Sequence, residues 1–209
     1  MKRNKIYAIV EGHGEAISPK KGQPPAVYAL IAKLLVDLQC WTLFPPSRHG
    51  PWRMSSSGDF FAKGKLEHVI RIHKRKMLDA AALLILFDLD DDCPAQKGPE
   101  IAERIRQMEE LPFSIVVVCA KCEYEAWFLA SLETIHPGHR YPDPPEEIRA
   151  AKGWLNRHFG YREAGDQSRY TQAIDIEMAW SRSRSFQRLY NALEQIKNAF
   201  DTETIIITP

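Results

Sequence analysis

The chain has 209 residues, enough for one well-buried domain and too few for two independent cores. Its 28 Lys and Arg nearly balance its 27 Asp and Glu, and a formal net charge of +1 excludes whole-molecule attraction to nucleic acid or anionic lipid. No apolar stretch approaches the roughly 20 residues that cross a bilayer, and four cysteines indicate reduced thiols rather than a disulfide framework. We therefore expect a cytoplasmic protein with no membrane attachment.

Strand and helix patterns alternate along the first 130 residues, which is typical of an α/β sheet with crossover helices. Continuous apolar runs predict strands at 5–10, 41–44, 81–88 and 113–119. Apolar residues at helical spacing, together with Pro99 at a first helical position, predict helices at 26–39, 64–77, 99–110 and 123–130. The polar stretch 47–58 has no period and is expected to be a long loop.

A proline-rich segment, residues 137–145, separates this α/β core (1–136) from a helical extension (137–209). The extension predicts helices at 146–159 and at 167–200, the second one broken near 181–185, and a final strand at 204–208 that packs on the core. We expect one folded unit with a mainly parallel sheet of about four to five strands flanked by helices.

Two of the apolar strands end abruptly in carboxylates. Glu11 follows the first strand, and Asp88 and Asp90 end the strand at 81–88. Because the carboxyl ends of parallel strands open onto a common site, these acids are expected to meet there, with both aspartates on one face of their strand. Carboxylates that close together repel one another unless a hard divalent cation neutralises them. The sequence therefore predicts a Mg²⁺ or Mn²⁺ site.

This pattern resembles the Toprim domain of topoisomerases, DnaG-type primases and overcoming-lysogenization-defect nucleases. Glu11 matches the single glutamate of the motif, and Asp88 and Asp90 match its Asp-x-Asp. The resemblance implies that Glu11 is a general acid or base or a metal ligand. It implies that both aspartates hold magnesium during phosphodiester cleavage or nucleotidyl transfer. The turn Val10-Glu11-Gly12-x-x-Glu15 is similar to the last of these families, which implies that Glu15 joins the metal ligands.

The stretch from Lys121 to Ala130, with Ser183-Arg184-Ser185-Phe186 later on, resembles a small bacterial Toprim-like family catalogued as a domain of unknown function, DUF4276. That resemblance extends over nearly the whole chain. It implies a Toprim-like, Rossmann-like fold.

Two further acids follow the strand at 113–119. Glu123 and Glu125 would lie at the same sheet edge as Asp88 and complete a second metal site, or they form an acidic pair at a helix N-terminus. Both interpretations remain open, with Glu125 favoured as the ligand. Lys121 would stabilise negative charge on a phosphate in the transition state, or it pairs with these glutamates.

Arginines outside the strands are candidates for contacts with substrate phosphates, because the guanidinium fork suits phosphate oxygens. They are Arg48, Arg53, Arg182 and Arg184. Nucleic acid, DNA or RNA, is accordingly the expected substrate.

Three functions remain open at this point. The leading one is a Mg²⁺-dependent nuclease, a hydrolase of phosphodiester bonds, in an anti-phage or mobile-element system, as in relatives by resemblance. A second is a haloacid-dehalogenase-type phosphatase with Asp88 as nucleophile, which leaves Glu11 unexplained. The third is a non-catalytic metal- or partner-binding subunit. The small size and the absence of an ATPase phosphate-loop motif favour dependence on an ATPase partner, and a homodimer is a further option.

Overall fold

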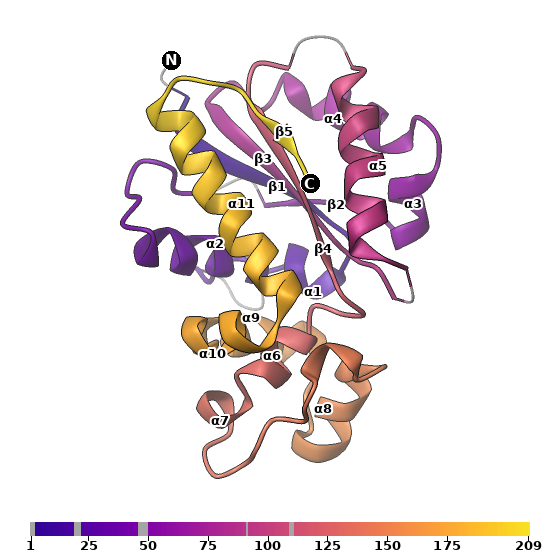
Figure 1. Ribbon diagram of the computed structural model, residues 1–209, viewed down its shortest axis with the longest axis vertical. Coiled ribbons are helices and arrows are strands. Elements are labelled where there is room, and N and C mark those ends of the chain that lie inside the picture. The colour runs from indigo at the N-terminus through magenta and orange to yellow at the C-terminus, as the bar shows by residue number, and fades with distance from the viewer. Residues whose placement is uncertain (1–2, 19–21, 46–49, 91, 109–110) are drawn as a thin grey trace.

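The computed structural model describes residues 3–18, 22–45, 50–90, 92–108 and 111–209. Within these residues, five parallel strands form one sheet in the order β2-β1-β3-β4-β5 (Figure 1). The strands are β1 (Lys5–Val10), β2 (Trp52–Arg53), β3 (Ala80–Asp88), β4 (Ser114–Ala120) and β5 (Ile207–Thr208). The predicted α/β class, with a parallel sheet flanked by helices, is confirmed and is consistent with a Rossmann-like fold.

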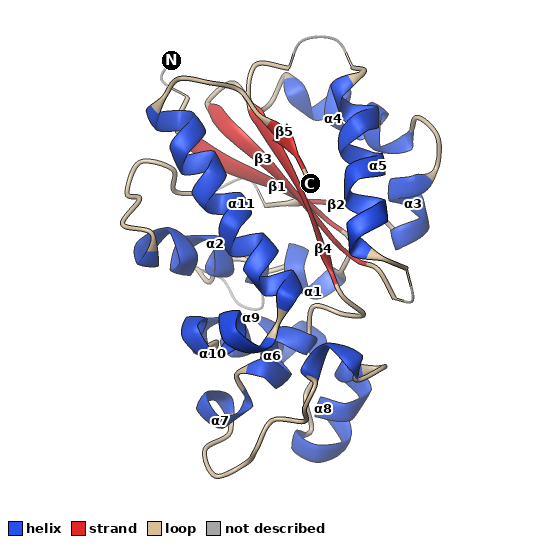
Figure 2. Ribbon diagram, viewed as in Figure 1, coloured by secondary structure: helices blue, strands red, loops and turns tan. Residues whose placement is uncertain are grey.

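Helices cover both faces of this sheet (Figure 2). The helices are α1 (His13–Ala16), α2 (Ala26–Asp37), α3 (Ser57–Phe61), α4 (Lys65–Lys74), α5 (Pro94–Arg106), α6 (Ala126–Ala130), α7 (Leu132–Ile135), α8 (Ala151–Phe159), α9 (Glu163–Ala173), α10 (Ile176–Arg182) and α11 (Arg184–Asp201), with a 3₁₀ turn at Pro145–Glu147. Helices α2 and α11 cover one face, and α3, α4 and α5 cover the other.

The inner strands are apolar throughout because both of their faces are buried. In β1, Ile6, Ala8 and Val10 pack in the cluster that contains α2 and α11, whereas Tyr7 and Ile9 pack in the cluster beneath α3, α4 and α5. The strand therefore has no polar side, and its apolar run ends only where the polypeptide leaves the sheet.

One expected strand was wrong. Residues 41–44 form no strand: only Leu43 is buried, while Trp41 is 64% exposed and stacks on Phe44 at the surface. The ladder position beside β1 is taken instead by β2, within the stretch expected to be a loop. Trp52 of β2 stacks on Tyr7, with ring centroids 5.5 Å apart. An edge strand of two residues needs no apolar run, so the apolar pattern selected the wrong segment.

Helix α5 also differs from its expected start. It begins at Pro94, and Pro99 lies inside it rather than at its first position. Both prolines are compatible with a helical φ, and the sequence alone favoured the wrong one. The final strand does add to the sheet edge, because β5 pairs in parallel with β4.

Helices α6 to α10 lie beyond the carboxyl ends of the strands, at the bottom of Figure 1. Helix α9 packs on α1 and α2, and α11 returns along the sheet against β4. The buried cluster on this face contains residues of both the core and the extension. In the part of the chain that the structure describes, no helix combines the length and apolar character needed to span a bilayer.

Within the extension, buried Glu146 joins the 3₁₀ turn at Pro145–Glu147 to the start of α11. Its carboxylate accepts hydrogen bonds from the Ser183 hydroxyl (2.7 Å), the Arg184 amide (3.1 Å) and the Ser185 amide (2.9 Å), and also from the Ser185 hydroxyl. Ser185 in turn accepts a hydrogen bond from the indole of Trp127 at 2.8 Å. The predicted break near 181–185 is thus a helix junction built around one buried carboxylate.

Candidate metal centre at the carboxyl edge of the sheet

The central expectation from the sequence concerned Glu11 and Asp88, and the structure brings them together. A carboxylate oxygen of Glu11 accepts a hydrogen bond from the backbone amide of Asp88 at 3.2 Å. The Asp88 carboxylate accepts one from the amide of Tyr124 at 2.9 Å. β1 and β3 are hydrogen-bonded neighbours, so residues that end them lie at one edge of the sheet.

Asp90 does not continue the strand. Its φ is +46°, and its amide donates to the carbonyl of Cys122 at 3.2 Å in an antiparallel bridge. We expected Asp88 and Asp90 to share one face because side chains two residues apart do so along an extended strand. That expectation was wrong, because the backbone turns at Asp90 and is no longer extended there. Asp90 is exposed, and with Glu123 and Arg149 it lines a hollow of about 140 Å³.

Glu15 reaches the same edge from α1, the short helix that follows β1. It is only 6% exposed, and the amide of Gln167 in α9 donates to one of its oxygens. A Cβ at Gly12 would lie 1.5 Å from the other oxygen, so the turn accommodates this carboxylate only because Gly12 has no side chain.

Glu125 and Glu123 arrive from the segment after β4. Glu125 is 1% exposed, and the Tyr161 hydroxyl donates to it at 2.9 Å. Glu123 accepts a hydrogen bond at 2.8 Å from the backbone amide of Lys152, in the first turn of α8. Glu123 therefore accepts a hydrogen bond from an otherwise free amide at the start of α8. The sequence had suggested this role for the start of the next helix along the chain, α6.

Glu11, Glu15, Asp88, Glu123 and Glu125 are called the acidic cluster below. Burial first, and then the charges of the other four, raise the pKa of Asp88 well above its ordinary value. Burial also raises the pKa of Glu11 and of Glu15, and it raises that of Glu125 to about 8. Two buried oxygens, one each on Glu15 and Glu125, have no hydrogen-bond partner among the described residues.

Lys152 provides positive charge beside this cluster. Its ammonium lies 2.7 Å from Glu163 and 3.9 Å from Glu125. Burial alone would lower the pKa of Lys152, but these carboxylates raise it above its ordinary value. Glu163 also accepts the amide of Gly14 at 3.0 Å, which ties α9 to the turn after β1. Among the described residues, no group of three or more His, Cys, Asp or Glu side chains is arranged so that it could hold a metal ion.

The cationic residues expected to meet phosphate are dispersed. Arg53 lies at the end of β2, where its guanidinium contacts the His13 ring at 2.6 Å, in the same short helix as Glu15. Lys121 directly follows β4 and is half-buried. Arg48 lies outside the described residues.

Two of the arginines have structural roles in the extension. Arg182 donates to the carbonyl of Ala130 at 2.9 Å and to Glu133 at 2.8 Å, and it stacks on Tyr141. Arg184 is exposed and begins α11 with its amide bonded to Glu146. Within the part of the chain that the structure describes, neither arginine bonds to a member of the acidic cluster.

The sequence did not identify the side chains that the extension supplies. These are Lys152, Tyr161, Glu163 and Gln167. None of them follows a strand or belongs to a short motif, and all lie on or next to surface helices of polar composition. Only the packing of α8 and α9 over the sheet edge makes them neighbours of the acids.

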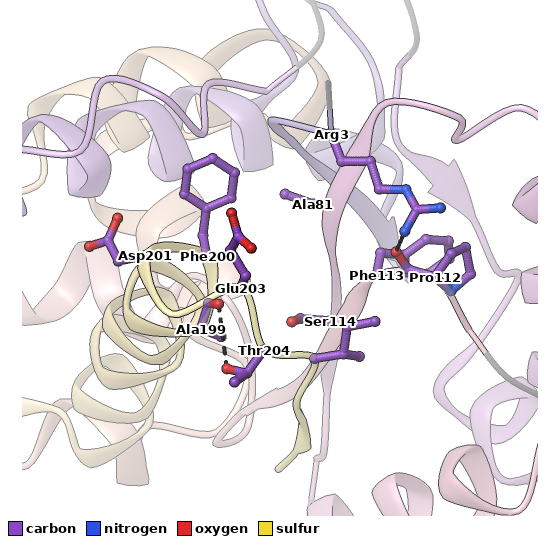
Figure 3. A pocket seen from close by; sticks show the side chains of 11 residues that line it. Arg3, Ala81, Pro112, Phe113, Ser114, Ala199, Phe200, Asp201, Glu203 and Thr204 are labelled. Carbon is purple, nitrogen blue, oxygen red and sulfur yellow. Dashed lines mark hydrogen bonds between the residues drawn. The ribbon is translucent and has the colours of Figure 1, made fainter. Parts of the chain in front are cut away.

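A separate hollow of about 500 Å³ lies at the opposite, amino edge of the sheet, between the end of α11 and the start of β4 (Figure 3). Asp201 and Glu203 contribute its carboxylates, and the guanidinium of Arg3 is turned toward the carbonyl of Pro112. No member of the acidic cluster lines it, so it is not part of the candidate site.

Comparisons with known proteins identify the family. A search of curated proteins and a search of solved structures each found no significant match. A family model described as a domain of unknown function, DUF4276, matches residues 10–194. The match includes Glu11, all the other acids of the cluster and the four residues from the extension, and it confirms the family resemblance seen in the sequence. The chain therefore belongs to the DUF4276 family.

Proposed function

We propose that this protein hydrolyses phosphodiester bonds in nucleic acid with Mg²⁺ or Mn²⁺ held by the acidic cluster, as a Toprim-type nuclease. One observation carries the proposal: four carboxylates from two segments, 11–15 and 123–125, gather around Asp88 at the carboxyl edge of the sheet, and their charges add to burial in raising its pKa. A protein that gathers five acids at the end of its sheet without using them would lose stability through their repulsion. A hard divalent cation removes that cost.

The chemical nature of the donor atoms suits such an ion, although binding requires the side chains to move closer together than they lie in this structure. The free oxygens of Glu15 and Glu125 are buried, negatively charged when ionised, and without a partner among the described residues. Carboxylate oxygens are the ligands that Mg²⁺ prefers, and two or three of them suffice because the ion keeps several waters. Glu11, Glu15, Asp88 and Glu125 would hold it, with Asp90 at the exposed rim.

The bound ion would neutralise phosphate charge and lower the pKa of a water that attacks phosphorus. Burial raises the pKa of Glu11 above its ordinary value, which suits a residue that accepts and returns a proton. Lys121 after β4 and Arg53 at the end of β2, on either side of the β1–β3 pair, would orient and neutralise the phosphate.

The test measures metal binding and cleavage together. Purified protein is incubated with Mn²⁺ or Mg²⁺ and with plasmid, single-stranded DNA or RNA, and the same metals are titrated by calorimetry. We expect metal-dependent cleavage that Asp88→Asn and Glu11→Gln reduce by at least about 100-fold, the scale of one general acid–base group. Asp92→Asn is the matched control, because Asp92 is exposed and belongs to no cluster contact.

Cleavage that persists in Asp88→Asn and Glu11→Gln would refute the catalytic proposal. So would metal binding that is equal in Asp88→Asn and in Asp92→Asn.

A second candidate, a non-catalytic metal- or partner-binding subunit, is favoured by one observation. Lys152 already neutralises Glu125 and Glu163, so the cluster is partly compensated without a metal. This candidate predicts metal binding by calorimetry with no cleavage of any of the three substrates by the protein alone. Activity that appears only when a partner ATPase is added would identify the subunit role.

We also place this activity in the cytoplasm, within a phage-defence or mobile-element system. All four cysteines are free thiols, as a reducing compartment permits. The cellular assignment is tested by phage plating on cells that express the wild-type protein or Asp88→Asn, where equal plating would refute it.

A further inference from the structure

A hollow of about 420 Å³ lies between α2, α10 and α11 and shares no lining residue with the acidic cluster. Helix α11 packs on both α2 and α10, at the left of Figure 1. The lining of the hollow combines apolar surface with negative charge, from Trp180, Tyr190, Ile176, Asp37, Glu177 and Glu194. No lysine or arginine among the described residues lines it.

The aromatic part of this hollow is held in place but not covered. Trp180 is 46% exposed, although it is one of the largest apolar side chains in the protein. Its backbone carbonyl accepts a hydrogen bond from Gln187 at 2.6 Å, which fixes the corner between α10 and α11. The Tyr190 hydroxyl donates to Asp37 at 2.7 Å, which fixes a carboxylate at the rim.

The negative charge of the hollow is not compensated within the described residues. No ion pair of Asp37, Glu177 or Glu194 occurs among them. The lysines on the same helices bond elsewhere: Lys33 donates to the carbonyl of Gln172 at 2.8 Å, and Lys197 donates to that of Leu38 at 3.0 Å.

We propose that this hollow binds an alkylammonium group, an organic cation on an apolar stem. An indole face attracts such a cation through its quadrupole, the apolar lining covers the methyl or methylene groups, and the three carboxylates supply the opposite charge. The same chemistry occurs in free quaternary amines and in lysine side chains of a partner protein. This proposal is independent of the function proposed for the acidic cluster.

The experiment follows the indole N–H of Trp180 by NMR in uniformly ¹⁵N-labelled protein, with the resonance assigned from Trp180→Phe. Three probes are titrated: choline, Nα-acetyl-lysine methylamide, and 3,3-dimethyl-1-butanol as the neutral isostere of choline. We expect saturable shifts with at least one cation, and an affinity at least about tenfold above that of the alcohol, which corresponds to about 1.4 kcal/mol. Preference between the two cations distinguishes a free amine from a lysine side chain.

Charge variants complete the test. The double variant Glu177→Gln/Glu194→Gln is expected to lower cation affinity at least about fivefold while the alcohol is unaffected, because only the electrostatic part is removed. Glu203→Gln, an exposed glutamate at the far end of α11, is the matched control and keeps wild-type affinity. Trp180→Ala lacks the indole, so its affinity is read from the backbone amide resonances that shift in the wild type; it is expected to be lower for both cations with an unchanged far-ultraviolet circular dichroism spectrum.

Equal affinity for choline and its neutral isostere would overturn the proposal. So would the absence of a saturable shift with either cation, or an equal loss of affinity in Glu203→Gln and in the double variant.

Discussion

Replacing Glu125 by Gln should change how the stability of the protein depends on pH. Glu125 is buried, and its pKa rises from the ordinary 4.5 to about 8. The folded state therefore keeps a proton on this carboxyl in a pH range where the unfolded state has lost it. A raised pKa in the folded state contributes stability that is complete below pH 4.5 and is lost as pH rises toward 8.

The magnitude follows from the size of the shift. Each pH unit in that range removes about 1.4 kcal/mol of the free energy of unfolding, so the step from pH 5 to pH 8 removes about 3 to 4 kcal/mol through this one group. Glutamine is isosteric with the protonated acid and keeps the carbonyl oxygen that accepts the Tyr161 hydroxyl. We therefore expect Glu125→Gln to match the wild type within about 1 kcal/mol at pH 5 and to exceed it by about 3 to 4 kcal/mol at pH 8.

The assay is urea unfolding followed by far-ultraviolet circular dichroism from pH 5 to pH 8, with EDTA present. Glu203→Gln is the control, because this exposed glutamate lies at the opposite end of α11 from the cluster. The reasoning is refuted if Glu125→Gln shows the same decline of stability with pH as the wild type, because Glu125 would then not carry the buried charge.

Three further outcomes are expected. Gly12→Ala places a methyl group 1.5 Å from the Glu15 carboxylate and should destabilise the protein by about 1–3 kcal/mol in thermal unfolding. Its control, Gly165→Ala, has open space around the new methyl group and should be neutral or stabilising by up to about 1 kcal/mol. Equal effects of the two substitutions would contradict the close approach of Gly12 to Glu15. Glu146→Ala leaves four hydrogen-bond donors without their acceptor and should lower the free energy of unfolding by about 3 kcal/mol or more. Glu147→Ala, at the exposed neighbouring residue, should lower it by under about 0.5 kcal/mol. A small effect of Glu146→Ala would show that the junction before α11 does not depend on the Glu146 carboxylate. Mg²⁺ should raise the melting temperature of the wild type more at pH 8 than at pH 5, because ionised carboxylates bind it better, and a pH-independent effect would argue against the acidic cluster as its site.

The sequence by itself determined the three inner strands and the edge at which their acids lie. The runs that became β1, β3 and β4 are apolar except at their first or last residues, Lys5, Asp88 and Ser114, as expected of strands that are buried on both faces. Strands of this kind are typical of parallel sheets, whose carboxyl ends share one edge, so Glu11 and Asp88 were expected to meet there if β1 and β3 are neighbours, as they are. This part was predictable because the cause lies within each local segment.

Only the tertiary structure decided what surrounds those acids. Lys152 and Glu163 come from helices whose sequences give no sign of a site, and they reach the cluster because α8 and α9 dock over the sheet edge. The left-handed turn at Asp90 depends on its bridge to Cys122, more than 30 residues away along the chain. Contacts between segments that are distant in the sequence depend on how the faces of helices and the sheet pack together, and no local residue pattern predicts that packing.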